Sequence, residues 1–391
     1  MISFEKALSI TLDAAKLYGE EKVPYLQSVG RVLSEDLYSD ISMPPFDKSA
    51  MDGYACRKAD LHLELKVIET IRAGYKPEKE VGYGQCSQIM TGAIVPDGAD
   101  TVIMVEHTES IGSAKILFTG EKTISNICYL GEDVIKGDLI LKSGTLLSSR
   151  HIPLLATIGV VSVPVYKQTR VGVIATGTEL VEPEQIPGIS QIRNSNASQM
   201  MIQISNLGLT PSYFGIAPDD EDKTYDQLSK ALESTDVLVL SGGVSMGEFD
   251  FVPSVLKRLG MELKYQKIAV QPGKPTTFAV RNNKFVFALP GNPVSSFVQF
   301  EILVKPFLLK CMGHDWRPPV WKLPAGEKFL RKKTERMSWI PVKLSDEGRV
   351  ISLDYHGSAH IFALNQAQGF IYFNVGQAQI DEGELVYVRP I

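Results

Sequence analysis

Residues 236–250 constrain the fold of this chain more than any other segment. The apolar run Val237-Leu-Val-Leu240 predicts a buried strand, and it opens directly into the glycine-rich stretch Ser241-Gly-Gly-Val-Ser245. Glycines allow positive φ angles and let backbone N–H groups come close to a ligand. Glu248 and Asp250 follow at once. Carboxylates beside backbone amides suit a phosphorylated ligand whose charge is balanced by a divalent metal.

Two further segments repeat this pattern of a strand followed by a glycine turn. They are Gln271-Pro-Gly-Lys-Pro275 and Leu289-Pro-Gly-Asn-Pro293. Three such turns at the ends of apolar strands predict one binding edge of a parallel sheet. Because prolines bracket Lys274 and fix its backbone, we expect that lysine to contact a phosphate or another oxyanion.

Strands and helices alternate from about residue 168 onward. Strands are expected at 171–175, 212–216, 237–240 and 285–289, and helices at 198–207, 222–232, 251–259 and from Pro293. Asn292 is a suitable N-cap for the last helix with Pro293 at its first position, and Pro306 should kink it. This alternation predicts a doubly wound α/β domain.

The rest of the chain reads differently. The spacing at 3–18 predicts an amphipathic helix that ends at Gly19, and residues 44–54 have no periodicity and are expected to form an ordered loop. Short β-rich runs between about 60 and 140 predict a small β-barrel or sandwich, and β segments return after about 315. A chain of 391 residues is expected to form two to four domains.

Composition excludes several classes of protein. With 40 Lys and Arg against 45 Asp and Glu, the net charge of −5 gives no basic face for nucleic acid. The four cysteines lie far apart, which favours reduced thiols over a disulfide framework. No signal peptide and no apolar run of ~18 residues is seen, so we expect a cytoplasmic protein with no membrane span.

Carboxylates are the main candidates for chemistry. Asp47 and Asp52 flank Ser49 in the first loop, Glu179 ends Thr176-Gly-Thr-Glu179, and Asp219 follows a predicted strand. Because the ends of parallel strands face one crevice, we expect Glu179, Asp219, Glu248 and Asp250 to converge. The alternative for Asp219 and Asp220 is that they only cap the next helix.

Other motifs carry less weight. The P-loop signature is absent, and Gly82-Tyr-Gly84 begins a dinucleotide motif that Ser87 does not complete. His356 and His360 lie four residues apart, but the neighbouring Gly357 and the β pattern argue against a helical zinc site. No Gly-x-Ser-x-Gly elbow occurs.

A set of motifs in a fixed order resembles the MoeA family, the molybdopterin molybdenumtransferases, which are related to the C-terminal domain of gephyrin. The motifs are Pro44-Pro-Phe-Asp-Lys-Ser-Ala-Met-Asp-Gly-Tyr-Ala55, Met90-Thr-Gly-Ala93, Val95-Pro-Asp-Gly-Ala-Asp100, Gly131-Glu-Asp133, Thr176-Gly-Thr-Glu-Leu180, Ser241-Gly-Gly-Val-Ser245, Gly247-Glu248, Pro272-Gly-Lys-Pro275 and Leu289-Pro-Gly-Asn-Pro-Val-Ser295. The resemblance implies insertion of molybdate into adenylylated molybdopterin, with Mg²⁺ assisting and AMP released.

The resemblance also implies the site. The catalytic residues would be Asp52, Asp219, Asp250, Lys267 and Lys274. The substrate would be bound by Thr91, Glu179, Ser241, Gly242, Gly243, Ser245, Pro290, Gly291 and Asn292. The metal would be held by Glu179, Asp219 and Asp250.

The architecture that the resemblance implies has four domains: an elongated domain I (1–45 with 140–167), a β domain II (46–139), a MogA-like α/β domain III (168–313) and a β-barrel domain IV (314–391). The family forms homodimers whose site joins domain III of one subunit to domain II of the other. A MogA-type adenylyltransferase would supply the adenylylated pterin. Competing hypotheses are a CinA-like nucleotide pyrophosphatase, which shares mainly domain III, and a non-catalytic pterin-binding scaffold.

Three positions depart from the family pattern. The chain has Lys48 where the family usually has Asn, Cys128 where it often has a basic residue, and Gln271 where it usually has Lys. Two cations are therefore replaced in a site for anions, and Lys48 is a candidate to restore one of them. The sequence does not distinguish molybdate from tungstate as the oxyanion that is inserted.

Overall fold

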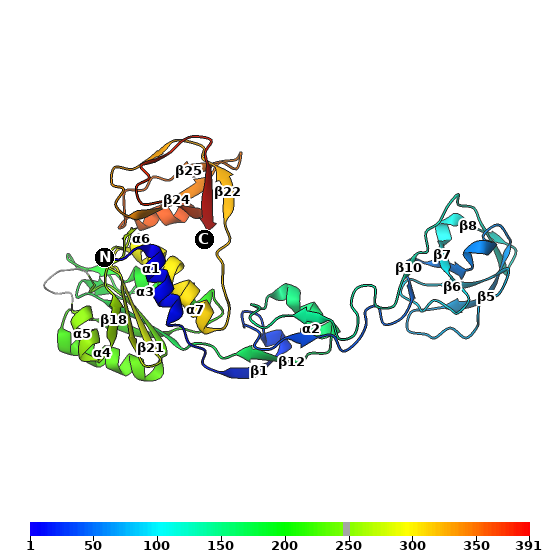
Figure 1. The fold of residues 1–391 in the computed structure, drawn as a ribbon, viewed down its shortest axis with the longest axis horizontal. Coiled ribbons are helices and arrows are strands. Elements are labelled where there is room, and N and C mark those ends of the chain that lie inside the picture. Colours follow the sequence, from blue (N-terminus) through cyan, green and yellow to red (C-terminus); the bar gives the residue numbers. More distant parts are fainter. Residues whose placement is uncertain (245–250) are drawn as a thin grey trace. The chain divides into compact units, whose positions relative to one another are not determined.

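A computed structural model describes residues 1–244 and 251–391, which fold into two compact units (Figure 1). The first unit contains Met1–Glu35, Ser143–Ile152 and Ser162–Ile391, and the second contains Asp36–Lys142 and Pro153–Val161. Four residues that the sequence assigns to the candidate site lie outside the described residues: Ser245, Gly247, Glu248 and Asp250. No helix among the described residues is long and apolar enough to cross a bilayer.

A six-stranded sheet forms the centre of the first unit, in the order β16-β13-β17-β21-β20-β18. The four strands β16 (Ser212–Ala217), β13 (Val171–Thr176), β17 (Val237–Ser241) and β21 (Lys284–Leu289) are parallel. The hairpin partner β20 (Thr277–Arg281) runs antiparallel to β21, and β18 (Glu262–Tyr265) antiparallel to β20. The predicted strands are therefore confirmed, and a short antiparallel extension is added to them.

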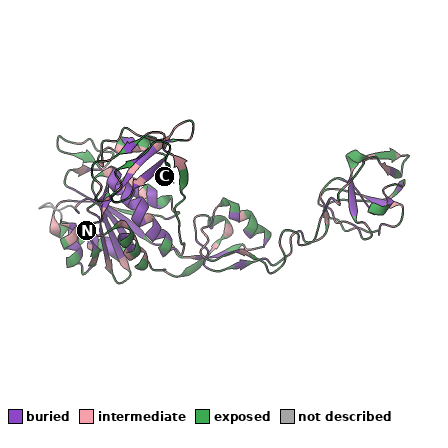
Figure 2. Cartoon of the chain, turned by 45° about the horizontal axis from the view of Figure 1, so that its top comes forward, coloured by how far each residue is buried: buried purple, intermediate pink, exposed green. Residues whose placement is uncertain are grey.

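Helices cover both faces of this sheet. Val237 and Val239 of β17 point into one core, together with residues of α3 (Ser195–Ser205), α6 (Pro293–Gln299) and α7 (Lys305–Cys311). Leu238 and Leu240 point into a second core with α4 (Glu221–Ser234) and α5 (Val252–Arg258). A strand buried on both faces is apolar throughout, and Figure 2 shows these central strands as buried. The doubly wound α/β class is confirmed.

The helix predicted from Pro293 begins at that residue, and two of its features go beyond the prediction. A π-helical turn, η5 (Phe300–Val304), separates α6 from α7, whose second residue is Pro306. Pro306 has no N–H to donate to the carbonyl of Ile302. Asn292 occupies the N-cap position, but its side chain donates to Ser358 Oγ at 2.8 Å and does not cap the helix. The predicted N-cap position and the helix start at Pro293 are therefore confirmed, although the Asn292 side chain makes no capping hydrogen bond.

A mixed sheet closes the first unit beyond the α/β part. Its order is β19 (Val270–Gln271), β24 (Met337–Leu344), β26 (Gly369–Phe373), β28 (Leu385–Pro390) and β22 (Trp321–Pro324), with β25 (Val350–Ser352) beside β24. Its core includes Val342, Ile371 and Phe373. The predicted β segments near 369–373 and 384–388 are confirmed.

The N-terminal segment packs on the α/β part of the same unit. The helix α1 (Phe4–Asp13) ends before the predicted end at residue 18, and residues Glu20–Pro24 form β1 beside β12 (Ser162–Tyr166). Ala7 is buried in the core that α7 also lines, and Thr11 Oγ1 lies 2.8 Å from the hydroxyl of Tyr265. Ile2 forms a parallel bridge with Ile268.

The second unit is built on another six-stranded sheet, in the order β7-β4-β6-β5-β9-β8. These strands are β4 (Gly53–Cys56), β5 (Leu65–Ile71), β6 (Gln85–Ile89), β7 (Thr101–Met104), β8 (Thr108–Ile111) and β9 (Lys115–Phe118). The segment expected as a loop at 44–54 contains β3 (Lys48–Ser49), paired with β10 (Ile127–Cys128), and the start of β4. Two-residue strands are too short to show periodicity in a sequence.

Candidate functional site

Two of the predicted glycine turns meet at one edge of the α/β sheet. Ser241 at the end of β17 lies beside Leu289 at the end of β21, because the two strands are parallel neighbours. The N–H of Gly242 donates to the carbonyl oxygen of Leu289 at 3.0 Å. A Cβ on Gly291 would stand 3.7 Å from the Cα of Gly242, so the turns are in direct contact.

The backbone of the first turn requires glycine. Gly242 has φ of +96°, and a Cβ there would lie 2.4 Å from the carbonyl oxygen of Thr176. Gly243 has φ of +65°, and its Cβ would lie 2.7 Å from Val252 Cγ2. The hydroxyl of Thr176 also donates to the Ser241 carbonyl at 3.3 Å. The turn is therefore packed tightly against the end of β13.

A residue that the sequence analysis did not identify joins the two turns. Asn196, in the first turn of α3, donates from Nδ2 to Ser241 Oγ and to the carbonyl oxygen of Gly291, both at 2.6 Å. An asparagine in the first turn of a helix is common and gave no signal by itself. Its role depends on tertiary structure, because the parallel strands β17 and β21 place both turns beside the N-terminus of α3.

Asp219 is held by the neighbouring strand end and does not cap a helix. The N–H of Thr178 donates to Asp219 Oδ2 at 2.9 Å, and the N–H of Asp219 donates to Thr178 Oγ1 at 3.0 Å. Asp220 instead is the N-cap of α4 and accepts the N–H of Lys223 at 2.9 Å. The capping alternative therefore holds for Asp220 and is wrong for Asp219.

Glu179 comes from the same loop as Thr178 and is exposed. A Cβ on Gly177 would lie 2.6 Å from Glu179 Oε2, which places the carboxylate against that glycine. Glu179 and Asp219 thus come from the adjacent ends of β13 and β16. Among the described residues, no group of three His, Cys, Asp or Glu side chains could hold a metal ion.

The third glycine turn reaches the same edge by a different route. The strand before it, β19, belongs to the C-terminal sheet, so this turn does not follow a strand of the parallel sheet as expected. It leads into β20, however, and Thr277 at the start of β20 lies beside Ala288 near the end of β21. Because β20 runs antiparallel to β21, it begins at the edge where β21 ends. The turn that precedes β20 therefore lies at this edge as well.

The third turn is anchored by buried and backbone contacts. Gly273 has φ of +108°, and the buried Gln299 donates from Nε2 to the carbonyl oxygen of Pro272 at 2.8 Å. Lys274 is exposed, and its carbonyl oxygen accepts the N–H of Ile268, the residue after Lys267, at 3.0 Å. This hydrogen bond places the backbone of Lys274 beside that of Ile268, so the two predicted lysines, Lys267 and Lys274, lie near each other.

An arginine stands beside Gln271. Arg336 donates from Nη1 to the carbonyl oxygen of Val270 at 3.2 Å and from Nη2 to Gln271 Oε1 at 3.4 Å. The pairing of β19 with β24 brings it there from 65 residues away in sequence. No local pattern in the sequence could have indicated this neighbour.

Asp52 and Thr91 belong to the second unit. Asp52 Oδ1 accepts the N–H of Thr91 at 2.6 Å and the hydroxyl of Thr91 at 2.8 Å. These two bonds, the backbone one first, lower the pKa of the exposed Asp52 carboxyl. In the same unit, Lys48 pairs across the strands with Cys128, two of the positions that depart from the family pattern.

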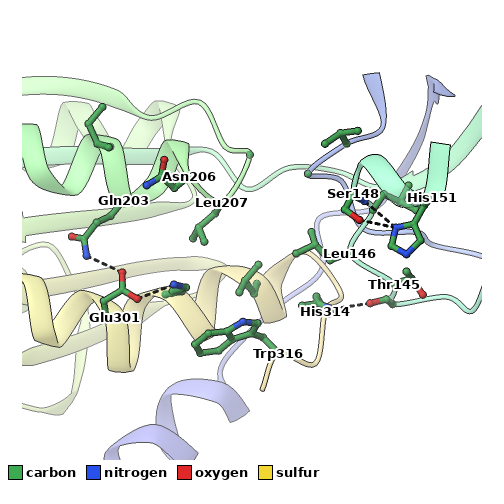
Figure 3. A pocket seen from close by; sticks show the side chains of 18 of the residues that line it. Thr145, Leu146, Ser148, His151, Gln203, Asn206, Leu207, Glu301, His314 and Trp316 are labelled. Atoms are coloured by element: carbon green, nitrogen blue, oxygen red, sulfur yellow. Dashed lines mark hydrogen bonds and ion pairs between the residues drawn. The ribbon is translucent and has the colours of Figure 1, made fainter. Parts of the chain in front are cut away.

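A separate cleft of about 1100 Å³ in the first unit contains none of the predicted site residues (Figure 3). Its buried carboxylate, Glu301, is already bound by Gln203 Nε2 at 3.0 Å and by Lys305 Nζ at 2.8 Å. His314 Nδ1 lies 2.8 Å from the carbonyl oxygen of Gly144. Because these groups satisfy one another, the cleft offers less to an anionic ligand than the glycine turns do.

Three protein-family models match the chain in sequence order. Residues 2–159 match the MoeA N-terminal region (domain I and II), residues 172–310 a probable molybdopterin binding domain, and residues 322–391 the MoeA C-terminal region (domain IV).

Curated relatives and solved structures match over nearly the full length. The molybdopterin molybdenumtransferase of Bacillus subtilis (strain 168) is 40% identical over 385 residues, which cover 95% of this chain and 90% of the relative. That of Haemophilus influenzae is 34% identical over 398 residues, covering 97% and 98%. The molybdopterin biosynthesis MoeA protein of Pyrococcus horikoshii OT3 is 28% identical and has a TM-score of 0.86 over 100% of both chains.

Proposed function

The chain belongs to the MoeA family, and from that premise we propose that it inserts molybdate into adenylylated molybdopterin and releases AMP. Its place is in molybdenum cofactor biosynthesis, as a molybdopterin molybdenumtransferase. One observation carries the proposal: three glycine turns and the Asp219–Thr178 pair gather at one sheet edge. Matches to the N-terminal and C-terminal regions favour this activity over a CinA-like hydrolase.

The residues at this edge suit the cleavage of a phosphoanhydride. Such a reaction needs backbone amides and cations around the phosphates. Gly242 and Gly243 let the backbone approach a phosphate closely, and Lys274 has no ion-pair partner within residues 1–244 and 251–391. Arg336 adds a second cation beside Gln271. We assign Lys274 and Arg336 to the phosphate and molybdate oxygens, with Lys267 next to them.

Magnesium fits the carboxylates that the structure describes at this edge. Mg²⁺ commonly takes one or two protein carboxylates and completes its shell with water and substrate phosphates. Asp219 uses Oδ2 for the N–H of Thr178, which leaves Oδ1 for a cation, and Glu179 is exposed beside it. When bound, the ion would neutralise charge that develops on the phosphates. We include Asp250 as the third carboxylate on the strength of the family resemblance.

We further propose a homodimer in which the second unit of one subunit completes the site of its partner. The support is that Asp52 and Thr91 belong to the second unit, whereas all the other described site residues belong to the first. Hydrogen bonds from Thr91 lower the pKa of Asp52, and its carboxylate has no ion-pair partner among the described residues of its own unit. A cytoplasmic location and a MogA-type adenylyltransferase as donor complete the proposal.

The test follows AMP release from adenylylated molybdopterin by the purified protein. With Mg²⁺ and molybdate present, we expect release of AMP and a pterin product that activates a molybdenum-dependent apoenzyme. Lys274→Gln should lower kcat/KM by about 100-fold, by analogy with loss of one electrostatic stabiliser. The matched control is Lys264→Gln, whose ammonium pairs with Glu262 at 2.6 Å. AMP release that is equal with and without molybdate would contradict the proposal.

A further inference from the structure

We propose that Asn196 is a positioning residue of this site, whose carboxamide locks the turn after β17 to the turn after β21. The inference rests on the proposed function, because these are the two turns assigned to the adenylylated substrate. Asn196 touches no assigned substrate group, so its effect on the reaction passes through the backbone of the turns.

The geometry fixes which way the carboxamide points. The carbonyl oxygen of Gly291 can only accept a hydrogen bond, so the atom facing it at 2.6 Å must be Nδ2. The second N–H of the same nitrogen then donates to Ser241 Oγ, also at 2.6 Å. Asn196 is 9% exposed, and its bond to Ser241 Oγ is buried while its bond to the Gly291 carbonyl is partly buried. One nitrogen therefore holds a side chain of the first turn and the backbone of the second.

Among the residues that the structure describes, few other hydrogen bonds join the two turns. The bond from Gly242 N–H to the Leu289 carbonyl lies at the strand ends, before the second turn begins. In the part of the chain that the structure describes, Asn196 is the side chain that forms hydrogen bonds with both turns. Gly291 is exposed and has no Cβ to pack against a neighbour. Asn292 in this turn is bonded to Ser358 Oγ, which belongs to neither turn, so it is the placement of this turn against the turn after β17 that depends on the Asn196 bond.

The oxygen of the same carboxamide is in an unfavourable environment. Asn196 Oδ1 is fully enclosed and has no hydrogen-bond partner among the described residues. A buried acceptor without a donor is unfavourable, and the opposite orientation of the amide would place two acceptors against each other at Gly291. The requirement to donate to both turns outweighs the loss at Oδ1. Local rules are broken in this way mainly at functional sites.

The helix start offers a matched control. Asn194 is the N-cap of α3 and accepts the N–H of Ala197 at 3.1 Å, but it forms no hydrogen bond with the described residues of either turn. Asn194→Ala should therefore weaken the helix without moving the turns. Asn196→Ala removes both bonds to the turns, and Asn196→Asp keeps the shape but turns an acceptor toward the Gly291 carbonyl.

In the AMP-release assay, both Asn196 variants should lower kcat by about 10- to 100-fold, because small misplacement of reacting groups is costly. KM should change by less than about threefold, since positioning acts mainly on the transition state. Asn194→Ala should lower Tm while kcat stays within about twofold of the wild type. A wild-type kcat in Asn196→Ala, or a loss matched by Asn194→Ala at equal Tm, would overturn the assignment.

Amide hydrogen exchange tests, without any substrate, whether Asn196 holds the two turns together. Asn196→Ala should speed exchange roughly tenfold at the amides of Gly242, Gly291, Asn292 and Val294, while β13 keeps its protection. If the wild type released no AMP, the proposed function would fail while this measurement still decided the role of Asn196. Unchanged exchange in both turns would show that Asn196 does not hold them.

Discussion

Asp52 is an exposed carboxylate that accepts two hydrogen bonds from a single residue, Thr91. The two bonds stabilise the ionised form, which is why the pKa of Asp52 is lowered. A carboxyl with a depressed folded-state pKa contributes stability above its unfolded pKa, and that contribution is lost as pH falls through the folded pKa. Asp52 should therefore stay charged to lower pH than an ordinary aspartate.

Thr91→Val removes the hydroxyl bond and keeps the backbone one. We expect the pKa of Asp52 to rise toward its ordinary value, measured by carbon NMR titration of the carboxyl group. The acid limb of the pH profile of AMP release should move to higher pH in the same variant. The control is Thr70→Val, which removes a bond to Gln88 elsewhere in the same sheet. An unmoved carboxyl titration would contradict the assigned cause.

Gln271 and Arg336 give a second prediction for single residues. Arg336→Gln removes the cation beside the third turn, so the molybdate concentration for half-maximal AMP release should rise about tenfold. Gln271→Lys alone should bring no gain, because its ammonium would lie against the guanidinium of Arg336. The double variant should recover much of the lost affinity. Strict additivity of the two changes would argue against a shared anion.

At the level of elements, apolar runs located the three inner parallel strands, β13, β17 and β21, because strands buried on both faces must be apolar throughout, whereas the edge strand β16 is only partly buried. The same reasoning placed the turns of β17 and β21 at one edge. It wrongly assigned the strand before the 271–275 turn to the parallel sheet. That strand, β19, instead pairs with β24, where Val270 lies beside Met337, 67 residues later in the sequence. It also missed Asn196 and Arg336, whose partners are distant in sequence.

A glycine comparison tests the turn after β17. Gly242→Ala adds a Cβ at positive φ and 2.4 Å from the Thr176 carbonyl oxygen. Gly376→Ala adds one at a similar φ of +84° with nothing within 4 Å. We expect the control to lose about 1 kcal/mol of unfolding free energy and Gly242→Ala about 2–4 kcal/mol, measured by urea denaturation. Equal losses would show that the turn can relax away from β13.

For the whole molecule, the assignment of site residues to two units predicts complementation between subunits. Asp52→Ala and Asp219→Ala chains should each release little AMP alone. After subunit exchange, half of the dimers are mixed and each carries one intact site, so roughly a quarter of the wild-type rate should return. Native mass spectrometry would verify the exchange. Mixed dimers with no activity would exclude a site shared in this way.

The packing of α1 has a consequence for the order in which the chain folds during synthesis. Residues Phe4–Asp13 emerge long before Lys305–Cys311, yet they pack against that helix and bond Tyr265. At translation rates of about 5–20 residues per second, roughly 15–60 s separate the two segments. The sheet of the second unit, complete at Phe118, can form during that interval. A nascent chain stalled before Lys305 should thus resist protease across Gly53–Phe118 while its first helix is still cut.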